Sequence, residues 1–349
     1  MIKQETFTKE NIDRIVSKHH VDYELAARAV FALGLVEALS KVGTKFVFKG
    51  GSSLMLLFDS PKRLSTDVDI LVPSDYDIKS YLDEAAKIFP FKGIEESPRK
   101  TNKKISKKHF RITYASTNSD KDFNVLVDVL FADNHYQKTL RVPINNDLLL
   151  CEGDDCFANV PSAESLLGDK LTAFAPHTIG INFFNEDFTN DKRLEVIKQF
   201  YDVSCLFDVS KDFEAVKETY EKIAIDEIGY RELDKNPKDC LLDSFNSALC
   251  VLSLGKFDKD DYPNYISGFK KIAGHILEKR LNAGNAYIDA AKIMFLSACL
   301  IKDIDPFKYE VVDDELLKEP PYNQINFVRK ADKDAFNYAA TAIELITKE

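Results

Sequence analysis

The stretch KFVFKGGSSLMLLF, residues 45–58, decides how the first part of the chain is expected to fold. A short run of β-branched and aromatic residues leads into two glycines, and Ser52, a favourable helix N-cap, precedes another apolar run. This order predicts a strand, a glycine turn and a helix. Backbone amides of such a turn, together with a helix N-terminus, can bind a phosphate group. The residues could equally form a plain strand-to-helix turn, and their spacing is not that of a Walker A loop.

The segment STDVDILV, residues 65–72, alternates with a period of two residues, which is typical of a strand. In that case Asp67 and Asp69 project from one face, roughly 6–7 Å apart. Carboxylates at this distance could share two divalent ions about 3.5–4 Å apart, the arrangement used for in-line displacement at phosphorus. An exposed face that carries two aspartates for solubility is the alternative, and it fits poorly with the apolar residues that follow.

Asp128 lies within FNVLVDVLFAD, residues 123–133, a nearly continuous apolar run typical of a strand covered on both faces. A carboxylate in such a strand is costly unless it is paired or bound to a cation. It could pair with Arg111 on the preceding predicted strand, HFRITYAS, residues 109–116. It could also complete a three-carboxylate metal site.

The periodicity divides the chain into two parts. Strands mix with helices predicted at 22–42 and 74–89 up to about residue 150, which indicates an α/β or α+β layer domain. After the segment at residues 161–175 strand-like alternation is scarce, and we predict helices at about 190–208, 211–224, 238–253, 263–281, 285–301 and 331–348. A chain of 349 residues exceeds the usual size of one core. We therefore expect two domains, 1–155 and 156–349.

The net charge of −10 means that the chain as a whole would be repelled by nucleic acid. The stretch SPRKTNKKISKKHFR, residues 97–111, is a local exception because it is basic and contains no acidic residue. It could be a solvated loop, or it could contact RNA phosphates without reading sequence. We assign this predicted RNA contact to Arg99, Lys100, Lys103, Lys104, Lys107 and Lys108.

Composition also bears on the compartment. The six cysteines show no metal-binding spacing and are expected to be reduced thiols. The N-terminus is charged from its third residue, and no apolar run approaches the roughly 20 residues of a membrane span. We therefore expect a cytoplasmic protein that does not enter a membrane.

Five segments in order extend these local patterns: KGGSSL (49–54), RLSTDVDIL (63–71), VLVDVLF (125–131), GDKLTAF (168–174) and KQFYDVSCLFD (198–208). Together they resemble the AbiEii/AbiGii toxin family of nucleotidyltransferases, within the polymerase-β-like superfamily. The resemblance spans about residues 45–210. It implies an α+β fold class, in which a polymerase-β-like nucleotidyltransferase domain with a mixed sheet is followed by an α-helical domain that completes the active-site cleft.

The resemblance also implies roles for individual residues. Asp67 and Asp69 would bind Mg²⁺ or Mn²⁺, with Asp128 as the third carboxylate. Lys170 would meet the nucleotide phosphates and Asp202 would orient the nucleotide or the attacking group, although these two embedded charges could simply pair with each other. The predicted nucleotide site consists of Lys49, Gly50, Gly51, Ser52, Ser53, Arg63 and Ser65.

Two departures from the family pattern accompany this assignment. The gap between the glycine turn and Asp67 is longer than in the superfamily at large, although Arg63 and Ser65 match the family's own pattern. Lys198 and Gln199 stand where the family usually carries a basic residue just before the last motif.

The implied activity is transfer of a nucleoside monophosphate from an NTP to an acceptor, with a tRNA 3′ end favoured. The protein would then be the toxin of a toxin–antitoxin, or abortive infection, system, with a cognate antitoxin as partner. Two alternatives stay open. One is transfer of a nucleotide or a phosphate to a protein or small molecule, and the other is a non-catalytic module that binds NTP or an antitoxin.

Overall fold

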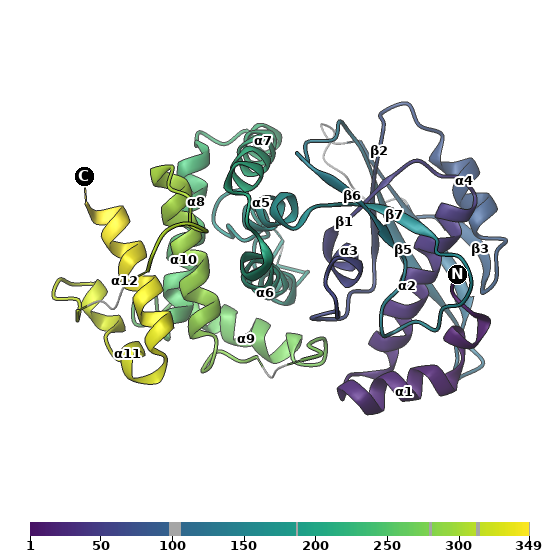
Figure 1. Ribbon diagram of the computed structural model, residues 1–349, viewed down its shortest axis with the longest axis horizontal. Coiled ribbons are helices and arrows are strands. Elements are labelled where there is room, and N and C mark those ends of the chain that lie inside the picture. The colour runs from purple at the N-terminus through teal and green to yellow at the C-terminus, as the bar shows by residue number, and fades with distance from the viewer. Residues whose placement is uncertain (98–105, 186–187, 279–280, 312–314, 349) are drawn as a thin grey trace. The chain divides into compact units, whose positions relative to one another are not determined.

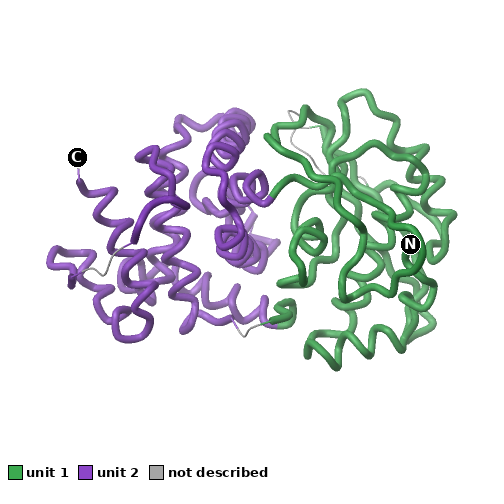
Figure 2. Tube along the Cα trace, in the orientation of Figure 1, with its two compact units in different colours: residues 1–162, 274–279 green, residues 163–273, 280–349 purple. Residues whose placement is uncertain are grey.

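The structure is a computed structural model that describes residues 1–97, 106–185, 188–278, 281–311 and 315–348 (Figure 1). The chain forms two compact units (Figure 2). Unit 1 consists of Met1–Ser162 and Gly274–Lys279, and unit 2 consists of Ala163–Ala273 and Arg280–Glu349. The expected division into functional domains at residues 155 and 156 stays a prediction.

Unit 1 is built on a mixed β-sheet. Within the described residues it has seven strands in the order β3-β4-β5-β2-β1-β7-β6. The pairs β2–β5 and β1–β7 are parallel, and the other neighbours are antiparallel. The strands are β1 Val47–Lys49, β2 Val68–Val72, β3 Phe91–Glu96, β4 Lys107–Ala115, β5 Asp122–Phe131, β6 Thr139–Pro143 and β7 Phe157–Pro161.

Unit 1 also contains the short 3-10 helix η1 (Gln4–Phe7) and helices α1 (Lys9–His19), α2 (Tyr23–Lys41), α3 (Gly50–Leu57) and α4 (Ile78–Ala85). Helix α2 packs against β2, β5 and β7, and its side chains from Ala29 to Leu39 are buried. Successive side chains of a strand point to opposite faces. In β4 this places Phe110, Ile112 and Tyr114 in the core and leaves the alternate positions on the more accessible face.

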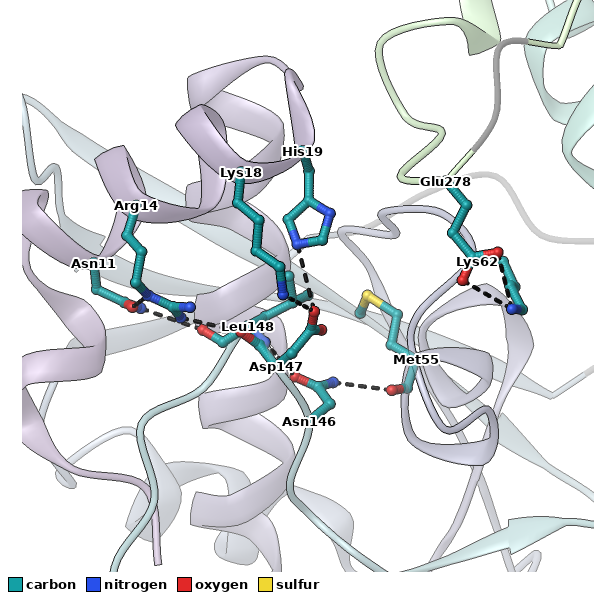
Figure 3. A network of polar contacts seen from close by, with 10 residues as sticks. All are labelled: Asn11, Arg14, Lys18, His19, Met55, Lys62, Asn146, Asp147, Leu148 and Glu278. Atoms are coloured by element: carbon teal, nitrogen blue, oxygen red, sulfur yellow. Dashed lines mark hydrogen bonds and ion pairs between the residues drawn. The ribbon is translucent and has the colours of Figure 1, made fainter.

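The late segment of unit 1, residues 274–278, pairs with the loop between α3 and β2. The amide of Leu64 donates to the carbonyl of His275 at 2.7 Å, and the amide of Leu277 donates to the carbonyl of Lys62 at 3.0 Å. Lys62 also forms an ion pair with Glu278 at 2.9 Å (Figure 3). The loop that carries Arg63 and Ser65 is therefore held by residues more than two hundred positions later in the chain.

The described part of unit 2 consists of helices and their connections. Helix α10 packs against α6, α8 and α12, and its apolar side chains form the centre of this core. The helices are α5 Ala163–Ala173, α6 Arg193–Val209, α7 Phe213–Arg231, α8 Pro237–Leu252, α9 Tyr262–Ile272, α10 Tyr287–Lys302, η2 Tyr322–Ile325, α11 Val328–Ala331 and α12 Lys333–Thr347. None of the helices that the structure describes has both the length and the apolarity of a membrane span.

These observations confirm the α+β class, but several predicted boundaries were wrong. The strand predicted over 65–72 begins only at Val68, so Asp67 precedes it. The helix predicted over 263–281 ends at Ile272, because the chain then extends to pair with residues 62–64. Strands β3, β6 and β7 were not predicted. The edge strands β3 and β6 carry charged residues, which interrupt the apolar pattern.

Candidate functional site

Four polar side chains lie in cross-strand register on four neighbouring strands of unit 1. Asp69 on β2 is the register partner of Asp128 on the parallel strand β5. Register partners on neighbouring strands share a face of the sheet, with backbones about 4.8 Å apart. The complete row is Lys49, Asp69, Asp128 and His109, on β1, β2, β5 and β4. With Lys107 these residues line a cavity of about 130 Å³.

The first glycine of the turn lies directly against this row. Gly50 has φ +75°, a left-handed conformation that favours glycine. A Cβ atom at Gly50 would overlap Oδ2 of Asp69 and would lie 2.9 Å from its Cγ. Glycine is therefore required here both by the backbone and by the carboxylate, and the turn and Asp69 belong to one site.

The second glycine of the turn, Gly51, allows two other residues of the predicted nucleotide site to approach its backbone. A Cβ atom at Gly51 would lie 2.7 Å from Nη2 of Arg63 and 2.8 Å from Oγ of Ser65. The Arg63 side chain is buried, and its Nη1 donates to the carbonyl of Leu64 at 3.2 Å. The structure thus brings Gly51, Arg63 and Ser65 together, and their role in binding a nucleotide stays a prediction.

The two serines of the turn stabilise its backbone. Ser52 Oγ donates to the carbonyl of Asp67, and Ser53 Oγ donates to the carbonyl of Gly50 at 2.8 Å. Both serines are fully buried. The Asp67 side chain is exposed, and Thr66 Oγ1 donates to its Oδ1 at 3.5 Å. Ser52 therefore fixes the segment that leads into Asp69, while Asp67 lies at its accessible end.

Helix α3, which begins at the glycine turn, is also held at its far end. The Asn146 amide donates to the carbonyl of Met55 on α3 at 2.9 Å. The next residue, Asp147, accepts from Lys18 at 2.7 Å, and its carbonyl accepts from Arg14 at 3.0 Å (Figure 3). Helix α1 thus fixes the loop at residues 146–148, and that loop in turn contacts α3.

The carboxylates of the row have the chemistry of a divalent cation site. No cluster of three or more His, Cys, Asp or Glu side chains that could hold a metal occurs among the residues described. Mg²⁺, however, is commonly bound by one or two carboxylates, with waters and substrate phosphates completing its shell. Asp69 and Asp128 supply such oxygens, and both line the cavity of about 130 Å³. The two carboxylates therefore fit such an ion, and a metal role for Asp67 stays a prediction.

His109 is the member of the row that the sequence did not reveal. Its Nδ1 lies 2.7 Å from Oδ1 of Asp128. The partner considered from the sequence was Arg111, which is in register with Leu126 and Glu95 instead. Only the register of β4 against β5 decides whether His109 or Arg111 lies opposite Asp128. That register is not encoded in the local pattern of either strand.

Lys170 and Asp202 lie together in unit 2. Lys170 Nζ is 3.1 Å from Oδ2 of Asp202, and the two side chains are 7% and 2% exposed. Lys170 also donates to Oε1 of Gln199 at 2.9 Å. The expected proximity is therefore confirmed, in the form of a buried ion pair. A role of either residue toward the nucleotide stays a prediction.

The basic stretch is described only in part. Lys107 and Lys108 open strand β4, Lys107 lines the cavity, and the Lys108 ammonium lies 5.8 Å from the ring centroid of Phe131. The Lys49 ammonium lies 5.7 Å from the ring centroid of Tyr136. Contact with RNA stays a prediction for the whole stretch. Its other members, Arg99, Lys100, Lys103 and Lys104, lie outside the described residues.

Comparison with known proteins assigns the class: the protein is a nucleotidyltransferase. A family model described as nucleotidyl transferase AbiEii toxin of a type IV toxin–antitoxin system matches residues 34–271. The chain belongs to this family, which confirms the resemblance seen in its motifs. No curated protein matches the sequence.

Two solved structures from Helicobacter pylori are similar to this chain. One, provisionally described as a nucleotidyltransferase, has 12% identity and a TM-score of 0.46, and the match covers 80% of this chain and 96% of that one. The other, JHP933, has 13% identity and a TM-score of 0.44, with 78% and 90% covered. Likeness at this level adds nothing to the assignment, which depends on the family match.

Proposed function

We propose that the protein uses Mg²⁺ to transfer a nucleoside monophosphate from an NTP to an RNA 3′ end, with tRNA as the acceptor, as the toxin of a toxin–antitoxin pair. The observation that carries this proposal is the register pairing of Asp69 with Asp128 beside the Gly50 turn. It brings two carboxylates and a glycine turn together, which supports the proposal because phosphoryl transfer commonly uses carboxylate-bound cations and phosphate-binding turns.

Each part of the site has a task in this reaction. The amides of Gly50, Gly51 and Ser52 bind the phosphates of the NTP, helped by the N-terminus of α3. Asp69 and Asp128 hold the cation, with Asp67 as a further ligand. The cation, when bound, neutralises phosphate charge and activates the acceptor hydroxyl. The hydroxyl oxygen bonds to the α-phosphorus and its proton passes to solvent, while the bond from the α-phosphorus to the pyrophosphate oxygen breaks and pyrophosphate leaves.

RNA is the acceptor that the charge pattern supports best. Lys107, beside the carboxylates, and Lys108 belong to a basic stretch in a chain whose net charge is −10. Such cations bind phosphates without selecting bases. A protein or small-molecule acceptor is the alternative. Membership of an enzyme family speaks against the non-catalytic module.

The proposal extends to Lys170 and Asp202, to which the family pattern gives roles toward the nucleotide and the attacking group. Because both residues lie within 156–349, the proposal includes a role for that helical domain in completing the active site. Their mutual ion pair is compatible with such roles, because a charged pair buried at 7% and 2% exposure is costly to retain for stability alone. The family also implies an antitoxin partner, whose chemistry this chain does not define.

The decisive experiment is mass analysis of total tRNA after reaction with all four NTPs and Mg²⁺. We expect a mass increase of one or more nucleotides for the wild type, and its loss in Asp69→Asn and in the Asp67→Ala, Asp69→Ala double variant. Asp122→Asn is the matched control, because Asp122 lies on β5 with Asp128 but is exposed and paired with Lys92. Transfer by the double variant at the wild-type rate would refute the assigned site. Labelling of protein or small molecules, with RNA unchanged, would favour the alternative acceptor.

A further inference from the structure

The contact between His109 and Asp128 has a defined chemistry. An ionised carboxylate can only accept hydrogen bonds, so the imidazole donates to it through Nδ1–H. The donor lies 2.7 Å from Oδ1, and the His109 side chain is 11% exposed. A carboxylate otherwise rotates within a broad torsional well. The nearly buried imidazole therefore restricts the rotation of the Asp128 carboxylate.

We propose that His109 is a positioning residue for nucleotidyl transfer: its hydrogen bond to Oδ1 holds the Asp128 carboxylate in the orientation in which it binds the cation. This inference depends on the proposed function, in which Asp128 is a cation ligand. Loss of a hydrogen bond to a ligating carboxylate typically costs about 10–100-fold in metal affinity or activity.

A second cross-strand hydrogen bond provides a comparison. Thr113 lies four residues after His109, on the same face of β4, and its Oγ1 donates to Oδ1 of Asn124 on β5 at 2.9 Å. Both contacts join the same two strands, but only the one from His109 reaches a carboxylate of the row. If His109 served merely to hold the strands together, removal of the Thr113 hydroxyl would have a similar effect.

Three variants of the full chain test the proposal. His109→Ala removes the donor. His109→Asn places an amide nitrogen close to the position of Nδ1, whereas the longer side chain of His109→Gln places it nearer the position of Nε2. Thr113→Ala is the matched control. Each is measured for Mn²⁺ affinity in the presence of a non-hydrolysable NTP analogue, by the electron paramagnetic resonance signal of free Mn²⁺, and for kcat and KM.

We expect His109→Ala and His109→Gln to bind Mn²⁺ about 10–100-fold more weakly than the wild type. At saturating metal, kcat of these two variants should fall to a similar extent, and KM for the nucleotide should change little. His109→Asn should recover most of both quantities, and Thr113→Ala should match the wild type. Wild-type Mn²⁺ affinity in His109→Ala, or equal impairment of the Asn and Gln variants, would overturn the proposal. The Asn and Gln pair decides the question even if the Ala variant does not fold.

The two levels of inference fail separately. If the wild type transfers no nucleotide to any acceptor but Mn²⁺ binding follows the expected order of variants, the proposed function falls, and what stands is that His109 positions Asp128 toward a cation. If the wild type transfers nucleotide and all His109 variants match it in both measurements, the proposed function stands and the positioning role falls.

Discussion

Gly50 and Asp69 approach each other so closely that no side chain fits between them. A Cβ atom on Gly50 would overlap Oδ2 of Asp69, and the left-handed φ of +75° at this residue independently favours glycine. The conformation of the turn and the position of the carboxylate are therefore parts of the same requirement. A mutation of Gly50 therefore has two separable effects: a loss of stability from the left-handed backbone and a displacement of the Asp69 carboxylate.

We predict that Gly50→Ala abolishes nucleotide transfer, whereas Gly43→Ala does not. Gly43 is the control because it has φ +78° with no atom within 4 Å of a Cβ added there. A left-handed alanine costs about 1–2 kcal/mol, so both variants should unfold at lower urea concentration. Only Gly50→Ala should also displace Asp69. Equal activity of the two variants would show that the close approach has no functional role.

Lys170→Met is expected to destabilise the protein by about 3–5 kcal/mol, because it removes the cation beside the buried Asp202 carboxylate. The double variant Lys170→Met, Asp202→Leu should recover part of this loss, since it removes both charges. Urea unfolding measures both effects. A double variant that regains stability but transfers no nucleotide would support functional roles for the pair. A Lys170→Met protein as stable as the wild type would contradict the structural one.

Acid should weaken the contacts of Asp191. Arg193, through hydrogen bonds at 2.8 and 2.7 Å, and then Lys271 hold the pKa of Asp191 well below its usual range. A lowered folded-state pKa gives stability that is present above the unfolded pKa and is lost as pH falls through the folded one. Asp191→Asn should therefore cost about 1 kcal/mol at pH 7 for this partly exposed group, and less below about pH 4. Urea unfolding across this range, with Asp83→Asn as a surface control, checks it. A loss that grows on acidification would contradict the assignment.

Asp243 should show the opposite dependence on pH. Burial raises the pKa of its carboxyl, although the His177 amide and the Thr178 hydroxyl donate to it at 2.9 and 2.8 Å. A raised pKa in an acid gives stability that is present below the unfolded pKa and is lost as pH rises through the folded one. Asp243→Asn keeps an acceptor oxygen but does not titrate. The wild type should therefore lose stability relative to the variant as pH rises from 4 to 7. Parallel stability curves for the two proteins would refute the prediction.

Local sequence patterns predicted the parts of the site that neighbouring residues determine. The strand and the helix around Gly50 follow from composition and appear as β1 and α3. The predicted N-cap was wrong, because the helix already begins at Gly50, with Lys49 rather than Ser52 as its N-cap. The apolar run around Asp128 correctly indicated a strand, β5, that carries a carboxylate. In each case the signal lies within about ten residues, which is the range over which periodicity can be read.

Contacts between distant segments could not be predicted in this way. The pairing of His109 with Asp128 depends on the register of two strands, and a shift of one residue would have turned His109 to the other face. The contact of Arg63 with Gly51 depends on residues 274–278, which sequence periodicity assigned to a helix. Asp67 was placed within a strand because alternation continues past the point at which backbone pairing ends.

The pairing of residues 274–278 with the loop that carries Arg63 constrains the order in which the protein folds during its synthesis. Most of unit 1 has been synthesised once Ser162 is added, but its last segment follows more than one hundred residues later. At about 5–20 residues per second, this interval is on the order of ten seconds. During that time the loop beside the phosphate-binding turn lacks the backbone partners of Lys62 and Leu64. A nascent chain therefore cannot form the complete backbone pairing of this loop until more than three quarters of the protein has been translated.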